Sequence, residues 1–223
     1  VAGAAVTYAL LRRKQRASKY DPGSAKALPA GQPASGPLSV CVYGSSSRHT
    51  PEAYKAAART LGAALAKRGH LCINGAGAQG VMGALNASCK AAGGRVRGVC
   101  HKMFVDGPIT ALFDGLELIQ TEGDGLTERK QALAEGADCF IALPGGPGTW
   151  DELWEVACAR QLGVGRSGPI CLVNTDGYYD GFVTQLERAH ADRLLCCGRC
   201  LNSSPPPPDP KAHAAARALP SKA

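Results

Sequence analysis

The chain has 223 residues and a formal net charge of +7, which allows one well-packed domain with tails but not two large cores. The positive charge lies in the tails. Residues 1–38 hold six Lys and Arg against one acid and residues 196–223 hold four against one, whereas residues 39–195 hold fifteen against sixteen. A near-neutral central part excludes a broad basic surface for a nucleic-acid backbone, so we expect no nucleic-acid partner.

Composition divides the chain into three regions. Residues 1–37 hold an apolar stretch too short to span a bilayer, then a basic cluster and a linker rich in Pro, Gly and Ala. Residues 38–195 are expected to form the folded domain. Residues 196–223 form a Pro- and Ala-rich tail that we expect to be disordered. We expect a cytoplasmic protein whose folded domain makes no membrane contact. Organelle targeting or membrane anchoring through the first segment is the alternative.

Strand and helix patterns alternate along residues 38–195. Apolar runs predict strands, and apolar residues at helical spacing predict the helices between them. This alternation, with short Gly-rich turns, predicts an α/β fold with a parallel sheet and helices on both faces. The predicted strands are residues 38–43, 71–73, 96–100, 116–120, 139–143 and 170–173, and the predicted helices follow Thr50, Gly80, Leu126, Gly148 and Gly177.

The ten cysteines fall into two groups. Five lie in apolar strand-like runs, where we expect small buried side chains in a reducing compartment rather than disulfides. Cys196, Cys197 and Cys200 contain one Cys-x-x-Cys pair without a second pair or histidines at zinc spacing, so we assign no metal site. The five strand cysteines are Cys41, Cys72, Cys100, Cys139 and Cys171.

The turn at residues 144–152 is the most informative stretch of the chain. It reads Pro-Gly-Gly-Pro-Gly-Thr-Trp-Asp-Glu and joins a buried strand to a helix. Glycines let a ligand approach the backbone N–H groups closely, and the helix dipole attracts anions, so the turn is suited to bind phosphate. We expect Thr149 to cap the helix and Glu152 to lie in its first turn. A purely structural turn is the alternative. The glycines concerned are Gly145, Gly146 and Gly148.

Three other polar segments are expected at the same edge of the sheet. Ligands gather where parallel strands end, and Ser45 to Ser47, Gly75 to Gly80 and Arg129-Lys130 all follow strands there. The Gly75-x-Gly77-x-x-Gly80 pattern follows the second strand, and the next strand closes with basic residues instead of an acid, so a dinucleotide site is disfavoured.

Together these residues resemble the signature of the LONELY GUY (LOG) family, the cytokinin riboside 5'-monophosphate phosphoribohydrolases. The resemblance rests on residues 144–152, on Arg129-Lys130 and on residues 44–47, and it extends over about residues 38–195. It implies a Rossmann-like homodimer without a cofactor that hydrolyses the N-glycosidic bond of an N6-modified AMP. The products are the free cytokinin base and ribose 5-phosphate.

The resemblance also implies roles for particular residues. Glu152 and Arg129 correspond to the catalytic pair, while substrate and phosphate binding fall to Lys130, Ser45, Gly77, Gly145, Gly146, Gly148 and Thr149. A carboxylate near C1' lowers the barrier by stabilising positive charge on the ribose, by activating water or by direct attack. A helix dipole would favour the ionised form of Glu152 over a role as acid.

Several alternatives stay open. A non-catalytic nucleotide or molybdenum-cofactor carrier of the same fold would need no carboxylate beside a ribose, and a broader AMP nucleosidase would share the chemistry. Departures from the family pattern at residues 75–80, 126–127 and 158–160 leave the preferred base open, and Asp106 or Asp114 is a candidate base contact. Decarboxylation would require a lysine for pyridoxal phosphate, and Lys130, the one lysine near the expected cleft, is better explained by phosphate binding.

Overall fold

The fold is built on one seven-stranded sheet, seen in a computed structural model that describes residues 7–9, 36–104, 117–164 and 168–195. The strand order is β1-β7-β6-β2-β3-β4-β5, and strands β2 to β7 run parallel. The predicted α/β fold with a parallel, Rossmann-like sheet is therefore confirmed. The strands are β1 (Thr7–Ala9), β2 (Ser39–Tyr43), β3 (Leu71–Asn74), β4 (Arg95–His101), β5 (Glu117–Thr121), β6 (Cys139–Ala142) and β7 (Ile170–Val173).

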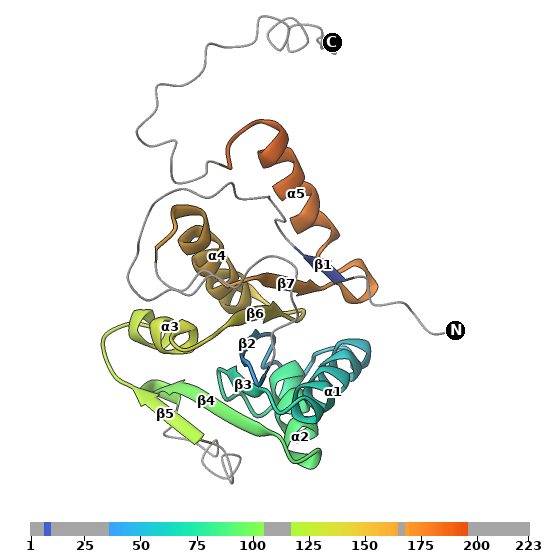
Figure 1. Cartoon of the computed structure of the whole chain (residues 1–223), viewed down its shortest axis with the longest axis vertical. Helices are drawn as coiled ribbons and strands as arrows, with labels where there is room; N and C mark the ends of the chain where they lie inside the picture. Colours follow the sequence, from blue (N-terminus) through green and yellow to red (C-terminus); the bar gives the residue numbers. More distant parts are fainter. Residues whose placement is uncertain (1–6, 10–35, 105–116, 165–167, 196–223) are drawn as a thin grey trace, which may run out of the picture.

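Helices cover both faces of the sheet, as predicted. Helices α1 and α2 pack on one face, and α3 and α4 on the other, with α5 beyond them near β7 (Figure 1). A crossover helix between parallel strands must lie on one face or the other. The helices are α1 (Glu52–Lys67), α2 (Gly80–Ala91), α3 (Thr127–Ala134), α4 (Pro147–Leu162) and α5 (Asp180–Ala191), with short 3-10 turns η1 (Lys102–Phe104) and η3 (Thr175–Gly177).

Strand β1 extends the sheet from a segment that the composition had separated from the folded domain. It pairs antiparallel with β7, with Thr7 opposite Val173 and Ala9 opposite Cys171. The rest of residues 1–35, the tail from residue 196 with its three cysteines, and Asp106 and Asp114 lie outside the described residues. Within the described ranges, each helix is too short or too polar to cross a bilayer.

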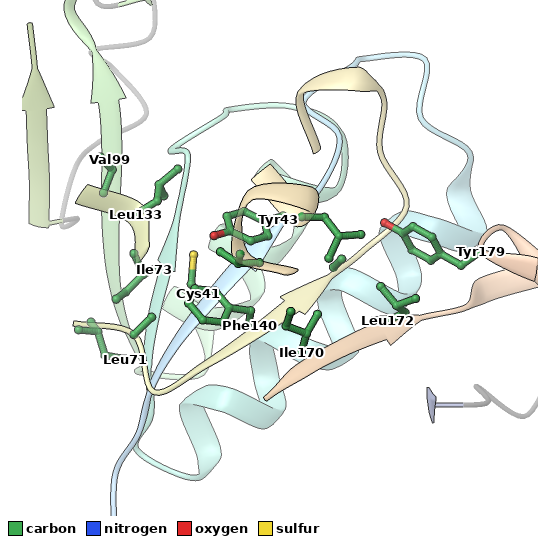
Figure 2. Packing of buried hydrophobic residues seen from close by; sticks show 14 residues of the cluster. Cys41, Tyr43, Leu71, Ile73, Val99, Leu133, Phe140, Ile170, Leu172 and Tyr179 are labelled. Carbon is green, nitrogen blue, oxygen red and sulfur yellow. The ribbon is translucent and has the colours of Figure 1, made fainter. Parts of the chain in front are cut away.

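Two apolar clusters hold the layers together. One lies between the sheet and helices α3, α4 and α5, where the rings of Tyr43 and Phe140 stack with centroids 6.1 Å apart (Figure 2). The other lies under α1 and α2 and is built on Val42, Val81 and Leu85. Burying these side chains supplies the main driving force for folding.

The described cysteines belong to this packing. Cys41, Cys72 and Cys100 are buried and Cys139 and Cys171 are partly buried, and the seven described cysteines are free thiols. Burial raises the pKa of the Cys72 thiol to about 12, so it stays protonated at neutral pH. The prediction of small buried side chains is confirmed for Cys41, Cys72 and Cys100, whereas Cys139 and Cys171 are only partly buried.

The start of α4 differs from the prediction. Helix α4 begins at Pro147 with Gly146 as its N-cap, so Thr149 is a buried residue of the first turn and not the cap. Pro is favoured at the first helical position because its missing N–H needs no partner there. Helix α1 follows Thr50 as predicted, with Pro51 as its N-cap, and the Thr50 hydroxyl donates to the Ser47 carbonyl at 2.7 Å within the preceding turn.

Candidate active site

Three loops and the start of helix α3 meet at the carboxyl ends of the parallel strands. The loop after β2 contacts the central loop (residues 144–149), since the Ser45 N–H donates to the Pro144 carbonyl at 3.2 Å. It also contacts the start of α2, where the Met82 N–H donates to the Ser45 carbonyl at 3.2 Å. Arg129 on α3 bonds to Glu152 on α4. The structure thus brings together the four segments that the sequence placed at this edge.

An ion pair lies at the centre of this edge. Arg129 Nη1 is 2.9 Å from Glu152 Oε1, and the two side chains are only 12% and 14% exposed. Arg129 Nε also donates to the Val99 carbonyl at 3.2 Å. A methyl group on Gly75 would lie 2.2 Å from Arg129 Nη2, so the guanidinium lies directly over that glycine. The Arg129 head group is therefore fixed between β4, β3 and α4.

Burial controls the charge of Glu152. Desolvation raises the pKa of its carboxyl above the ordinary range, and the Arg129 guanidinium opposes this rise. The sequence had predicted the opposite bias, from the helix dipole. That expectation was wrong in direction because desolvation by burial outweighs the charges that favour the ionised form. Since α4 begins at Pro147, Glu152 also lies in the second turn rather than the first. A carboxyl whose pKa is raised accepts a proton more readily than an exposed glutamate does.

Lys130 has carboxylate partners of its own. Its Nζ is 2.6 Å from Glu155 Oε2 and 3.1 Å from Asp151 Oδ2. The hydrogen bond that Lys130 donates to Glu155 is the main reason that the pKa of Lys130 is raised. An incoming phosphate would therefore have to share this ammonium with two carboxylates. Glu155 is therefore held in an ion pair with Lys130.

The central loop combines a tightly packed part with an open part. A methyl group on Gly145 would lie 2.2 Å from the Thr149 hydroxyl and 2.9 Å from the Ser45 nitrogen, so only glycine fits there. Gly146 and Gly148 are exposed, and nothing lies within 4 Å of a methyl group built on either. The open side exposes backbone at the start of a helix, where an anion is favoured by both the N–H groups and the dipole.

The loop after β3 is packed against the loop after β2. A methyl group on Gly77 would lie 2.9 Å from both Ser46 Cβ and Met82 Cε. Gly80 has a positive φ of 63°, and a methyl group there would lie 2.5 Å from the Ser45 carbonyl oxygen. Gly77 therefore lies in the loop cluster, and its nearest neighbours are side chains rather than open space.

The sequence did not indicate several side chains that hold this edge together. The Asn74 amide oxygen accepts from the Ala76 N–H at 2.9 Å, and Asn86 on α2 bonds to Asn74 at 2.6 Å. Tyr178 and Tyr179 donate their hydroxyls to carbonyls of the chain around the central loop. A polar residue at the end of an apolar strand was the available signal for Asn74. In the sequence, Tyr178 and Tyr179 resemble the apolar residues that usually begin a helix, so no signal pointed to the hydrogen bonds of their hydroxyls.

Comparison with known proteins identifies relatives of this chain. The family model described as "Possible lysine decarboxylase" matches residues 82–196. Cytokinin riboside 5'-monophosphate phosphoribohydrolase LOG5 of Arabidopsis thaliana is 39% identical over 156 residues, which cover 70% of this chain and 67% of the relative. The LOG enzyme of Oryza sativa subsp. japonica is 37% identical over 157 residues, covering 70% of this chain and 63% of the relative.

Solved structures agree on the fold. The Moco carrier protein of Chlamydomonas reinhardtii superposes with a TM-score of 0.51 at 23% identity, covering 71% of this chain and 97% of that one. At this identity the likeness concerns the fold alone. The sequence relatives are closer, although the chain spans only about two thirds of their length.

Proposed function

Because the chain belongs to the LOG family of cytokinin riboside 5'-monophosphate phosphoribohydrolases, we propose that it hydrolyses the N-glycosidic bond of an N6-modified AMP. The observation that carries this proposal is the nearly buried Arg129–Glu152 pair beside an open Gly-rich loop. A protein that only carries a phosphorylated ligand has no need of a desolvated carboxyl next to its anion site, since such a carboxyl repels the ligand.

The reaction consumes one water molecule. The water oxygen bonds to C1' of the ribose, the bond between C1' and the base nitrogen breaks, and its electron pair leaves with the base. One proton of the water ends on the base, so the products are the free base and ribose 5-phosphate. Positive charge builds on the ribose along the way, and a nearby carboxylate lowers the barrier.

Glu152 is the proposed carboxylate. Its raised pKa makes it a better proton acceptor than an ordinary surface glutamate, which supports a role in activating water as well as in stabilising charge. Arg129 holds the Glu152 carboxylate through Nη1. The remaining donors of its planar guanidinium suit a phosphate or ribose oxygen.

The central loop is the proposed site for the 5'-phosphate. The exposed backbone at Gly146 and Gly148, at the start of α4, supports this assignment, and Gly145 and Thr149 are packed beneath it. Ser45 joins the first loop to this loop. Lys130 contributes a positive charge that the phosphate would share with Asp151 and Glu155.

We also propose that the protein is a homodimer that uses the outer face of α4. Trp150, Trp154 and Leu162 are 43%, 40% and 52% exposed and recur at multiples of four residues, which places them on one stripe of the helix. A groove of about 370 Å³ runs beside the two tryptophans and is lined further by Tyr178, Tyr179 and Phe182. An apolar stripe of this kind is typical of a subunit interface.

The direct test of the reaction is release of free base from N6-isopentenyl-AMP and from AMP, followed by chromatography of both products. We expect base and ribose 5-phosphate in equal amounts from at least one of the two nucleotides. The ratio of the two rates separates a cytokinin-specific enzyme from a broader AMP nucleosidase. Binding of both nucleotides without any cleavage would favour the carrier alternative instead.

The dimer is tested by light scattering coupled to size-exclusion chromatography. Trp154→Asp should yield a monomer, because a charge in the middle of an apolar interface is costly to bury. Leu194→Asp is the control, since Leu194 is exposed but lies outside the stripe. A wild-type chain that runs as a monomer would refute the proposed dimer.

A further inference from the structure

Three successive carbonyl groups at the start of the central loop are tied to groups outside it. The Leu143 carbonyl accepts from the Tyr179 hydroxyl at 2.8 Å, and the Pro144 carbonyl accepts from the Ser45 N–H at 3.2 Å. The Gly145 carbonyl accepts from the Tyr178 hydroxyl. Two of these three donors, Tyr178 and Tyr179, come from the segment between β7 and α5.

A hydrogen bond to the carbonyl of one residue also sets the direction of the N–H group of the next residue. In a trans peptide the C=O of one residue and the N–H of the next point in opposite directions. When the Gly145 carbonyl is held toward Tyr178, the Gly146 N–H is held away from Tyr178. The Tyr178 hydroxyl therefore fixes the direction of an N–H group on the exposed side of the loop.

A rigid turn places the two tyrosines. The Asn174 amide oxygen accepts from the Tyr179 N–H at 2.6 Å, and its amide nitrogen donates to Asp180 Oδ1 at 2.6 Å. Between these bonds Asp176 has a φ of 53°, a left-handed conformation that costs a non-glycine residue about 1 kcal/mol. A strained residue persists only where the surrounding bonds over-determine it, as the bonds of Asn174 do here.

Packing limits the movement of the tyrosine rings. Tyr179 is buried beside Leu172 at one end of the core cluster (Figure 2). The Tyr178 ring meets Tyr179 edge-on, with centroids 4.9 Å apart, and meets Tyr54 of α1 at 5.6 Å. Each tyrosine ring thus packs against neighbouring side chains on two sides, which limits where its hydroxyl can lie.

We propose that Tyr178 and Tyr179 are positioning residues for phosphate recognition: they tie the Gly145 and Leu143 carbonyls, so that the Gly146 N–H is presented to the 5'-phosphate. This inference rests on the proposed function, because it assigns the tyrosines to the same anion site. Tyr178 acts on the loop peptide that leads into α4, whereas Tyr179 anchors the end of β6 and also fills the core.

The test replaces Tyr178 by Phe in the full chain, which removes the hydroxyl and keeps the ring. Tyr54→Phe is the matched control, because its ring packs on Tyr178. Inhibition of nucleotide hydrolysis is measured with ribose 5-phosphate and with adenosine, which lacks the phosphate. For Tyr178→Phe we expect the inhibition constant of ribose 5-phosphate to rise about tenfold. The constant for adenosine should change by less than about twofold, a difference too small to reflect a lost hydrogen bond.

The outcomes separate the inference from the proposed function. Unchanged ribose 5-phosphate inhibition in Tyr178→Phe, or equal weakening of both inhibitors, would overturn the inference while wild-type hydrolysis remained intact. Tyr54→Phe should match the wild type for both inhibitors; if it weakened ribose 5-phosphate as strongly as Tyr178→Phe, general loosening of the rings would replace hydroxyl positioning as the explanation. A wild-type chain that neither cleaves a nucleotide nor binds ribose 5-phosphate would overturn both proposals.

Discussion

Gly75→Ala is expected to disable the site while leaving the fold intact. The new methyl group would lie 2.2 Å from Arg129 Nη2, whereas ordinary contacts begin at 3.4 Å, so the guanidinium has to retreat by more than an ångström. The obstructing atom is the end of a flexible side chain, so the protein can yield there without moving its backbone. The retreat breaks the 2.9 Å bond from Arg129 to Glu152.

The expected magnitude follows from that displacement. A misplacement of about 1 Å in a catalytic group lowers the rate about 100-fold, or about 2.7 kcal/mol in barrier height. Gly75 does not have a left-handed φ, so the substitution adds no backbone strain. The free energy of unfolding should fall only by the loss of the Arg129–Glu152 bond, about 1–3 kcal/mol.

The assay pairs base release with urea denaturation. Gly181→Ala is the matched control, because nothing lies within 4 Å of a methyl group at that position. It should retain both rate and stability. A Gly75→Ala protein with wild-type turnover would refute the assignment of Arg129 to the reaction. A large loss of stability would show that the backbone, not the Arg129 side chain, gives way.

Three further predictions concern charge, backbone and core. Burial raises the pKa of Glu152, so its carboxylate becomes protonated at a higher pH than an ordinary glutamate, whose pKa is about 4.3. The acid limb of the pH profile of kcat should therefore lie above about pH 4.3. A kcat that stays unchanged down to about pH 4 would contradict this prediction. In Gly80→Ala the backbone keeps a φ of 63°, and the new methyl group would lie 2.5 Å from the Ser45 carbonyl oxygen. The free energy of unfolding, measured by urea denaturation, should therefore fall by about 2 kcal/mol or more. A loss below about 0.5 kcal/mol would count against a fixed contact between the two loops. Phe140→Ala removes a ring that is 1% exposed and should cost about 3–5 kcal/mol in the same measurement, with a loss under about 1 kcal/mol refuting its place in the core.

The sequence predicted the architecture well because hydrophobic period and Gly-rich turns carry that information locally. Strand 170–173 was predicted to the residue, and α3 was predicted over its observed range. The same signals predicted that four polar segments would meet at one edge of the sheet, since parallel strands end together.

The details that depend on contacts between distant segments were not predictable in this way. Helix α4 has Gly146 rather than Thr149 as its N-cap, with Thr149 packed against Gly145, and this start places Glu152 beyond the first turn. Burial then set the direction of its pKa shift. The hydroxyls of Tyr178 and Tyr179 meet carbonyls more than thirty residues away, and no periodic pattern records such a pairing.

The central claim is that Glu152 takes part in cleavage rather than in ligand binding alone. The most direct measurement compares wild type with Glu152→Gln in two assays on the same samples, equilibrium binding of AMP or N6-isopentenyl-AMP and single-turnover release of base. The account predicts that Glu152→Gln binds the nucleotide within about tenfold of wild type and loses at least about 100-fold in the rate of base release. A Glu152→Gln protein that releases base at the wild-type rate would contradict the account.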